Sequence, residues 1–355
     1  MKIAVVLFNL GGPSGPQAVR PFLFNLFNDP AIITSPQPFR WLLAQLISRR
    51  RAPVAQKIYE QIGGKSPILE MTEHQATALN TRLNDSDDDE YQTFVSMRYW
   101  HPMSDETANR VKEYGPDRIV LLPLYPQFST TTTGSSLNDW HRAAAKAGLL
   151  VPCHAICCYP ADGGFVAAVT GLLETALKTV PKGEKPRVLF SAHGLPKKIV
   201  DAGDPYPEHV EQSVTAIVDR MDMKDLDWVI CYQSRVGPLE WIGPSTDDEI
   251  ARGAADGRAL VIVPVAFVSE HSETLVELDI EYRELAESLN VTTYIRVPAV
   301  ADDAAFIGGL KDLVGQALIG GDSGDRAGIT SGDGNRACAT DCPTCPLNQR
   351  TNQNV

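Results

Sequence analysis

The chain has 355 residues, of which 43% are hydrophobic and 21% charged, and its formal net charge is −12. This length is typical of two domains or one large α/β unit, and the hydrophobic content excludes a wholly disordered chain. The acidic charge argues against a nucleic-acid-binding protein, which usually carries a basic face, although it leaves room for a local basic patch.

The N-terminal apolar run is too short for the core of a signal peptide, and no small-residue cleavage site follows it. No stretch reaches the roughly 18 apolar residues that span a bilayer. The sequence therefore predicts a cytoplasmic protein. Three of its 7 cysteines crowd together from Cys338 onward, and in a reducing compartment such crowding favours a metal site over disulfides.

The first half of the chain opens with a buried strand over 3–8 that runs into a glycine-rich loop at 9–16. A turn explains this loop, although such loops also let a flat or phosphorylated ligand approach the backbone. Its spacing matches neither a dinucleotide fingerprint nor a P-loop, so both are rejected. The other elements expected here are helices over 17–29, 68–84 and 163–179 and strands over 91–97, 119–124 and 150–157.

Residues 39–51 combine apolar side chains at helical spacing with three arginines at their end. An ordinary amphipathic helix with a favourable basic C-terminus explains this pattern. Aromatic and aliphatic residues beside a basic cluster also suit a membrane surface or the lip of a site for a hydrophobic ligand. On the residues alone, both interpretations stay open.

The second half alternates strands with helices, which implies a mainly parallel sheet with helices on both faces. We therefore expect an α/β fold of two lobes, with the default ligand site in the cleft between them. The predicted lobes cover residues 1–165 and 166–318, and a flexible tail rich in Gly, Asp and Ser covers 319–355. The expected elements are strands over 187–192, 227–232, 259–264 and 291–296 and helices over 207–222, 246–254, 273–289 and 302–318.

A histidine, His193, lies just past the strand over 187–192. Ligand sites of open α/β sheets lie beyond the carboxyl ends of strands. Gly194 lets the backbone turn beside the imidazole, and Pro196 stops the strand. Because most lone histidines are structural or lie on the surface, His193 becomes a functional candidate only together with a second stretch downstream.

That second stretch places Glu273, Glu277 and Glu281 on one face of a helix that starts within 269–272. A solvated acidic face is the common explanation of such a pattern. Against it, Glu273 stands at the helix start, beside His271 and just beyond a strand end. Histidine and stacked carboxylates at a cleft suit either a divalent cation or proton transfer, because neighbouring carboxylates raise the pKa of one member.

These two stretches resemble the ferrochelatase family, whose enzymes insert ferrous iron into a porphyrin. The strongest matches are Phe-Ser-Ala-His-Gly-Leu-Pro at 190–196 and Phe-Val-Ser-Glu-His-Ser-Glu-Thr-Leu at 267–275. One such motif would be weak evidence, whereas an ordered set is specific. Further matches follow the family's order at 9–13, 62–68, 98–102, 122–127, 233–238 and 241–244.

The resemblance implies two Rossmann-like lobes, each built on a mainly parallel four-stranded sheet, with the porphyrin in the cleft between them. It implies conversion of protoporphyrin IX into protohaem, the terminal step of haem biosynthesis. His193 would accept pyrrole protons or ligate the incoming iron. Glu273, with His271 beside it and Glu277 behind it, would relay protons or metal.

The resemblance also implies a set of residues that grip or line the porphyrin site. Among them, Arg98 is expected to pair with a propionate, and Tyr99 and Trp241 to stack on or edge the macrocycle. The full set is Leu10, Tyr59, Ser66, Arg98, Tyr99, Tyr125, Ser129 and Trp241. Residues 39–51 match the family's hydrophobic lip, which favours peripheral membrane contact and protoporphyrin IX over coproporphyrin III.

The cysteine-rich tail contains Cys338, Cys342 and Cys345 in a C-x₃-C-x₂-C spacing, which is poor for a structural disulfide and suitable for a cluster. Some ferrochelatases carry a C-terminal [2Fe–2S] cluster, so the resemblance favours that cofactor, with a zinc site as the alternative. The spacing differs from that of animal enzymes, whose internal cysteine ligand falls on Thr130.

The fourth cluster ligand must therefore come from elsewhere. Cys158 is the first candidate, followed by Cys157 and Cys153, while Cys231 has the pattern of a buried strand residue. Two other functions remain in view: a chelatase for another tetrapyrrole or metal such as cobalt, and a non-catalytic haem- or porphyrin-binding protein with an iron–sulfur sensor. The intact His193 and Glu273 count against the second, and the oligomeric state stays open.

Overall fold

The computed structural model describes residues 1–85, 89–235, 237–321, 328–332, 337–338 and 342–346. The chain forms two compact units. The first holds residues 1–159 and the stretch from Leu310 that includes the last strand, and the second holds residues 160–309 and residues 337–346, here called the cysteine segment. Residue 236 of one family motif and residues 339–341 of the cysteine spacing lie outside the described residues.

The first unit is built on a parallel sheet of five strands in the order β2-β1-β3-β4-β9. The strands are β1 (Lys2–Asn9), β2 (Glu90–Met97), β3 (Arg118–Pro123), β4 (Cys153–Cys158) and β9 (Ile329–Ser331). The apolar run over 3–8 is buried on both faces, as expected for a central parallel strand.

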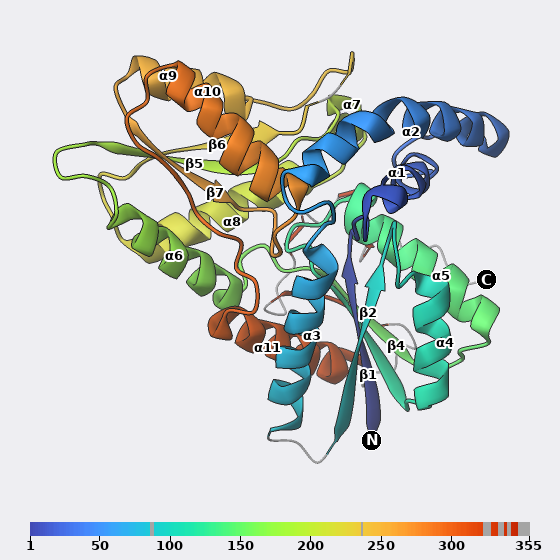
Figure 1. Cartoon of the computed structure of the whole chain (residues 1–355). Helices are drawn as coiled ribbons and strands as arrows, with labels where there is room; N and C mark the ends of the chain where they lie inside the picture. Colours follow the sequence, from blue (N-terminus) through green and yellow to red (C-terminus); the bar gives the residue numbers. More distant parts are fainter. Residues whose placement is uncertain (86–88, 236, 322–327, 333–336, 339–341, 347–355) are drawn as a thin grey trace. The chain divides into compact units, whose positions relative to one another are not determined.

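The helices of the first unit cover both faces of this sheet: α3 lies on one face, and α4 and α5 lie side by side on the other (Figure 1). Right-handed crossovers explain this arrangement, because the chain reverses direction across the sheet after β2. The helical elements are η1 (Pro16–Ala18), α1 (Val19–Phe27), α2 (Gln37–Glu60), α3 (Ile68–Asn84), α4 (Ser104–Tyr114), the π-helical turn η2 (Thr130–Gly134) and α5 (Ser135–Ala147).

The second unit is built on a parallel sheet of four strands in the order β6-β5-β7-β8. Helices α6 and α8 pack against each other on one face, and α9 and α10 pack on the other (Figure 1). The strands are β5 (Pro186–His193), β6 (Asp227–Gln233), β7 (Ala259–Pro264) and β8 (Tyr294–Arg296). The helical elements are α6 (Gly163–Leu177), α7 (Lys197–Asp201), α8 (Tyr206–Met221), α9 (Thr246–Ala255), the π-helix η3 (Glu273–Glu281), α10 (Tyr282–Ser288) and α11 (Ala304–Gly321), which ends in the first unit.

The α/β class and the two mainly parallel sheets are confirmed, but the first sheet has five strands and not the four expected. The extra strand, β9, lies in the stretch that was predicted to be flexible. The Ala155 amide donates to the Gly328 carbonyl, and Cys158 pairs with Ser331. A three-residue strand is too short to show the alternation of apolar and polar residues that identifies a strand in a sequence. Its pairing with the free edge of β4 therefore defines it.

Helix α4 was not expected from the sequence because it buries only a narrow apolar stripe. Its buried apolar residues are Ala108 and Val111. Its ends follow ordinary capping rules: Asp105 and Glu106 lie in the first turn, and Gly115 ends the helix at φ +67°. Helix α2 is also longer than the predicted 39–51 segment and continues through an internal proline, Pro53.

Candidate functional site

His193 is the last residue of β5 and lies at the carboxyl edge of the second sheet. Beyond it, the Gly194 amide donates to the Gln233 carbonyl over 2.9 Å. A Cβ atom on Gly194 would lie 2.8 Å from that carbonyl oxygen and 3.3 Å from Cε3 of Trp241. Only glycine therefore lets Trp241 pack this close to the turn. The His193 side chain remains 39% exposed.

Glu273 is the first residue of η3, and it joins two histidines. Its Oε2 atom lies 2.9 Å from Nδ1 of His193 and 3.5 Å from Nε2 of His271. The ring of Phe267 packs between them, with centroids 6.5 Å from His193 and 4.6 Å from His271. The predicted catalytic residues of β5 and of the segment after β7 therefore form one cluster.

His193 and Glu273 are electrostatically coupled. Burial lowers the pKa of His193, but the charge of Glu273 and the hydrogen bond to it outweigh burial, so the net pKa lies above the ordinary value. Burial raises the pKa of Glu273, while the charge and hydrogen bond of His193, and then those of His271, bring it well below its usual range. Glu273 is therefore an ionised carboxylate that favours a protonated His193.

Glu277 lies one turn further along η3 and is held by several donors. Its carboxylate accepts from Gln233 Nε2 at 3.0 Å, from the Ser234 amide at 2.7 Å and from the Ser234 hydroxyl. Burial and the charge of Glu273 raise the pKa of Glu277, although the Ser234 hydrogen bonds oppose them. This carboxyl group can therefore change protonation state closer to neutrality than an ordinary glutamate.

A tyrosine connects Glu277 to the surface. The Tyr282 hydroxyl lies 3.2 Å from Oε1 of Glu277 and 3.3 Å from Oδ2 of Asp247, which is exposed. Sequence reasoning missed both residues, since neither belongs to a family motif quoted for the chain. The third glutamate of the predicted ladder, Glu281, is exposed.

The acidic segment is a π-helix and not the predicted α-helix. In a π-helix the hydrogen bonds run from i to i+5, and such turns occur frequently at functional sites. At the start of η3, the Thr274 hydroxyl accepts a hydrogen bond from the His271 amide at 3.0 Å. Over nine residues, apolar spacing does not distinguish a π-helix from an α-helix, so the sequence pattern could not reveal the difference.

In the first unit, the predicted porphyrin residues Arg98 and Tyr99 surround a buried carboxylate, Asp29. Arg98 Nη2 lies 2.7 Å from Asp29 Oδ2, and the Tyr99 hydroxyl donates to the same oxygen over 2.7 Å. Arg98 Nε also donates to the Ser135 hydroxyl at 2.6 Å. Tyr99 is fully buried, so its ring supports Arg98 through a contact of 4.9 Å between the guanidinium and the ring centroid.

The other predicted porphyrin residues divide between the units. Trp241 belongs to the second unit and is half-buried, and its strand-like bridge to Pro196 holds it beside the His193 turn. The rest belong to the first unit. There Leu10 is half-buried, and the buried residues are Tyr59, Ser66, Tyr125 and Ser129.

The predicted lip forms an exposed apolar face of α2. Five of its large apolar side chains are between 39% and 65% exposed, namely Phe39, Trp41, Leu42, Leu43 and Leu46. At helical spacing Phe39, Leu42, Leu43 and Leu46 share this face, whereas Trp41 packs against Phe24. Arg49, Arg50 and Arg51 follow in the helix and are exposed. An exposed apolar face of this kind marks an interaction surface. In the part of the chain that the structure describes, no helix has the length and apolarity needed to cross a membrane.

The three tail cysteines gather in one buried cluster of Cys338, Cys342 and Cys345. Beside it lies a histidine that sequence reasoning missed: Nε2 of His209, in α8, is 3.4 Å from Sγ of Cys338. No motif links the two, since 129 residues separate them in the chain. His209 and Cys338 belong to a buried group whose donor atoms lie within 4.8 Å of one another and could hold a metal ion. Thiol and imidazole donors suit a soft metal.

The remaining cysteines belong to strands. Cys157 and Cys158 are buried in β4, and Cys153 at the start of that strand is half-buried. Burial raises the pKa of Cys153 to about 12 and that of Cys231 to about 12. Cys231 lies in the core of the second sheet and accepts a hydrogen bond from Thr246, as expected of a structural residue.

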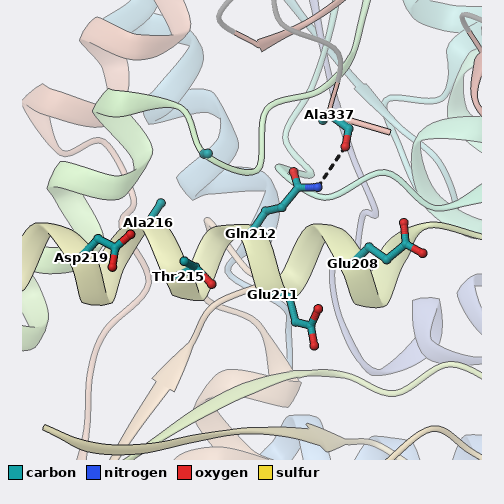
Figure 2. A pocket seen from close by; sticks show the side chains of 8 residues that line it. Glu208, Glu211, Gln212, Thr215, Ala216, Asp219 and Ala337 are labelled. Carbon is teal, nitrogen blue, oxygen red and sulfur yellow. Dashed lines mark hydrogen bonds between the residues drawn. The ribbon is translucent and has the colours of Figure 1, made fainter. Parts of the chain in front are cut away.

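A pocket of about 600 Å³ is lined mainly by side chains of α8 (Figure 2). Its walls carry Glu208, Glu211 and Asp219, so it is acidic. At its rim, Nε2 of Gln212 donates to the carbonyl of Ala337 over 2.9 Å, which anchors the start of the cysteine segment (Figure 2).

The sequence comparisons with known proteins agree on one family. Residues 2–318 match the family model described as Ferrochelatase, which ends before the cysteine segment. A protein named Ferrochelatase from Caulobacter vibrioides (strain NA1000 / CB15N) is 48% identical over 349 residues, 98% of both chains. Another of that name from Pelagibacter ubique (strain HTCC1062) is 50% identical over 315 residues, 88% of this chain and 91% of its own length.

Among solved structures, the chain is similar to the sirohydrochlorin chelatase SirB from Bacillus subtilis subspecies spizizenii in complex with cobalt. The TM-score is 0.53 with 12% identity, and the match covers 91% of this chain and 98% of that one. At this identity, the similarity concerns the fold.

Proposed function

The chain belongs to the ferrochelatase family, and from this premise we propose that it inserts ferrous iron into protoporphyrin IX to form protohaem, with His193 and Glu273 as its chemical centre. Insertion of iron into a porphyrin for haem synthesis is the reaction of this family. The observation that carries the residue assignment is the hydrogen bond of 2.9 Å between the half-exposed imidazole and the ionised carboxylate. A base held by an anionic partner is what removal of pyrrole protons requires.

The proton balance defines the task of His193. The porphyrin loses two pyrrole N–H protons while a dication enters, so the ring becomes a dianion and the product is neutral at its centre. Nδ1 of His193 donates to Glu273, which leaves Nε2 to accept a pyrrole proton. Because Glu273 raises the pKa of His193, the imidazole is a stronger base than an isolated one. Ligation of iron by the same nitrogen is the competing role.

The carboxylates behind Glu273 provide a route for protons. Glu277 has a raised pKa, and the Tyr282 hydroxyl bridges it to exposed Asp247. We assign this chain of groups to proton release, with delivery of the metal cation through the same carboxylates as the alternative. Arg98, Trp241 and the predicted pocket residues of the first unit are assigned to the porphyrin.

The test of the reaction is an anaerobic assay of ferrous insertion, read by absorbance, with protoporphyrin IX and coproporphyrin III side by side. We expect turnover with protoporphyrin IX. Turnover with coproporphyrin III alone would keep the enzyme and overturn the proposed substrate. Tight porphyrin binding without any insertion would instead favour a non-catalytic porphyrin-binding protein.

We further propose that the exposed face of α2 binds the membrane surface, which makes the protein a cytoplasmic enzyme with peripheral membrane contact. Burying one leucine contributes about 1.5–3 kcal/mol, and each arginine near an anionic surface about 1 kcal/mol. Replacing Leu42 or Leu46 with Glu should therefore weaken co-flotation with phosphatidylglycerol vesicles by about tenfold or more. Leu150→Glu is the matched control, because Leu150 is 94% exposed and lies outside this face. Equal flotation of all variants would contradict the proposal.

The cysteine segment is proposed to hold a [2Fe–2S] cluster through Cys338, Cys342 and Cys345. Support comes from the burial of the three thiols in one cluster. The sequence favours Cys158 as the fourth ligand, with Cys157 and Cys153 as alternatives. A bound cluster would supply a cross-link and a one-electron centre with a structural or sensing role. Iron and acid-labile sulfide in equal amounts are expected, and iron without sulfide would contradict the cluster.

A further inference from the structure

We propose that Arg296 is a positioning residue that holds both ends of the segment 270–279 in place for the reaction. This segment carries the predicted catalytic residues His271, Glu273 and Glu277. Arg296 ends β8 at the carboxyl edge of the second sheet, the edge at which β5 also ends. The inference rests on the proposed function and adds to it the residue that fixes this acidic segment.

Two carboxylates, one near each end of the segment, contact the guanidinium of Arg296. Nη1 donates to Oε1 of Glu270 over 2.8 Å, and Nε lies 3.3 Å from Oδ2 of Asp279. Glu270 directly precedes His271, and Asp279 follows Glu277 by two residues. One cation therefore joins the two residues that bracket the predicted catalytic groups, an arrangement here called the arginine clamp.

The clamp is shielded from solvent and balanced in charge. The side chains of Arg296 and Glu270 are 12% and 13% exposed. A second arginine, Arg283, donates from Nη2 to Oδ1 of Asp279, so two carboxylates face two guanidinium groups. Ion pairs that are partly buried are screened much less by salt than exposed pairs. Loss of one partner leaves the other charge uncompensated, so the network favours a single geometry of the segment.

The chain after Arg296 reinforces the clamp through its backbone. The Val297 amide donates to the carbonyl of Ile262, in β7, over 2.8 Å, and the Ala301 amide donates to the Val268 carbonyl over 3.0 Å. Between them, the Ala299 amide donates to Oε1 of Glu270 at 3.0 Å. Residues 296–301 are therefore tied along the loop that leads from β7 to His271.

The imidazole of His271 depends on this backbone support, because its own polar contacts are weak. Nδ1 is buried and has no hydrogen-bond partner among the residues that the structure describes. Nε2 lies 3.5 Å from Oε2 of Glu273, which is long for a hydrogen bond. Productive sites hold their groups within about 0.5 Å of the required geometry. The position of the ring therefore follows that of the neighbouring Glu270, which Arg296 holds.

The experiment compares Arg296→Lys with Arg187→Lys in the full-length protein. Lysine keeps the charge but replaces a planar fork with a single ammonium group, which serves two separated carboxylates poorly. Arg187 is the matched control: its side chain is 8% exposed and contacts Asp227 and Asp256, at the start of β5 and thus at the opposite edge of the same sheet. Both variants should melt below the wild type.

Only Arg296→Lys should slow the reaction. We expect kcat for ferrous insertion to fall by about tenfold, because a misplacement of 1 Å can cost about 100-fold. The Kd for protoporphyrin IX should stay unchanged, since the clamp acts on the acidic segment. An unchanged kcat in Arg296→Lys overturns the inference, and so does an equal fall in Arg187→Lys.

Asp279→Asn tests the second contact at a half-buried position, where loss of folding is not expected. It should also lower kcat. Two changes that break the same contact are not additive, so the double variant Arg296→Lys/Asp279→Asn should be little slower than Arg296→Lys alone. A double variant whose loss equals the product of the two single losses would show that the residues act independently, which overturns the clamp.

Hydrogen–deuterium exchange separates the clamp from the proposed function. Amides of residues 270–279 should exchange faster in Arg296→Lys than in the wild type, because local opening reports local stability. The same amides should keep the wild-type rate in Arg187→Lys. Unchanged exchange in Arg296→Lys overturns the inference whatever the activity. A wild type that inserts no iron overturns the proposed function, while faster exchange confined to 270–279 in Arg296→Lys still supports the clamp.

Discussion

Two histidines of the second unit each lie beside one polar side chain, a carboxylate for His193 and a thiol for His209. Their surroundings differ. His193 is 39% exposed, and Nδ1 contacts the carboxylate of Glu273 at 2.9 Å. His209 is fully buried, and Nε2 contacts the thiol of Cys338 at 3.4 Å. An open imidazole with a hard oxygen partner suits transient chemistry, whereas a closed one among sulfur atoms suits permanent ligation.

Their positions in the fold account for this difference. His193 ends a strand, so its side chain stands at the sheet edge where loops leave room for a ligand. His209 lies in the first turns of α8, against the helix face that receives the cysteine segment. The same residue type therefore has two different environments, which depend on the element that carries it and on the residues that cover it.

The strongest test of the comparison is His193→Ala. General acid–base groups contribute about 10²- to 10⁴-fold to rates, so we expect a fall of that size in kcat for iron insertion. Porphyrin binding and the visible absorption of the metal centre should persist. His74→Ala, an exposed histidine of α3, is the control. Unchanged turnover in His193→Ala would show that this imidazole is not the base.

The second test removes one thiol of the buried cysteine cluster, through Cys345→Ser. Cys345 is fully buried, and metal binding adds its free energy to the folded state. We expect loss of the visible absorption and a melting temperature lower by about 5 °C or more, since 1 kcal/mol corresponds to about 2–4 °C in larger domains. Cys153→Ser should keep the absorption, because burial raises the pKa of that thiol to about 12. Equal melting of both variants would argue against a structural centre.

The third test is the pH dependence of Glu273→Gln. His193 must be neutral to accept a proton, so activity is lost as the pH falls through its pKa. In the wild type Glu273 raises that pKa against the effect of burial. Without the carboxylate, burial lowers the pKa, and the acid limb of the kcat/KM profile should move to lower pH. Glu281→Gln, at an exposed position of η3, should leave the limb in place. If the acid limb of the kcat/KM profile keeps its position in Glu273→Gln, the proposed coupling between Glu273 and His193 is wrong.

The smallest expected effect is that of Tyr282→Phe. The variant keeps the ring in the core and removes the hydroxyl between Glu277 and Asp247. One hydrogen bond contributes about 0.5–1.5 kcal/mol, so kcat should fall by about two- to tenfold. Tyr114→Phe, whose hydroxyl bonds the Glu90 carbonyl in the first unit, is the control. Identical rates for both variants would remove Tyr282 from the proton route.

Much of the fold was predictable because buried parallel strands and amphipathic helices leave clear periods. The strand Ala259–Pro264 and the helix Ile68–Asn84 begin and end where the sequence predicts. β9 was missed because its pairing with β4, and not its own pattern, defines it. Helix α4 was missed because two buried apolar residues make too thin a stripe.

The site divides in the same way. His193 and Glu273 were predictable because each follows a buried strand and belongs to a family motif. His209 and Asp29 were not, because neither has a local signal: a helix brings His209 to Cys338, and Asp29 meets Arg98 across 69 residues of chain. Long-range polar contacts of this kind depend on tertiary packing, which single-sequence patterns do not encode.

The acidic side chains of the π-helix η3 depend on the number of residues between them. The hydrogen bonds of η3 run from residue i to residue i+5, so deletion of one residue between Glu273 and Glu277 would change the direction of every later side chain about the helix axis. Glu277 would leave Gln233 and Ser234, and Tyr282 would leave Asp247. Substitution at half-buried Leu275 changes one contact, whereas its deletion changes them all. Over η3 the site therefore tolerates changes in residue type more readily than changes in residue number.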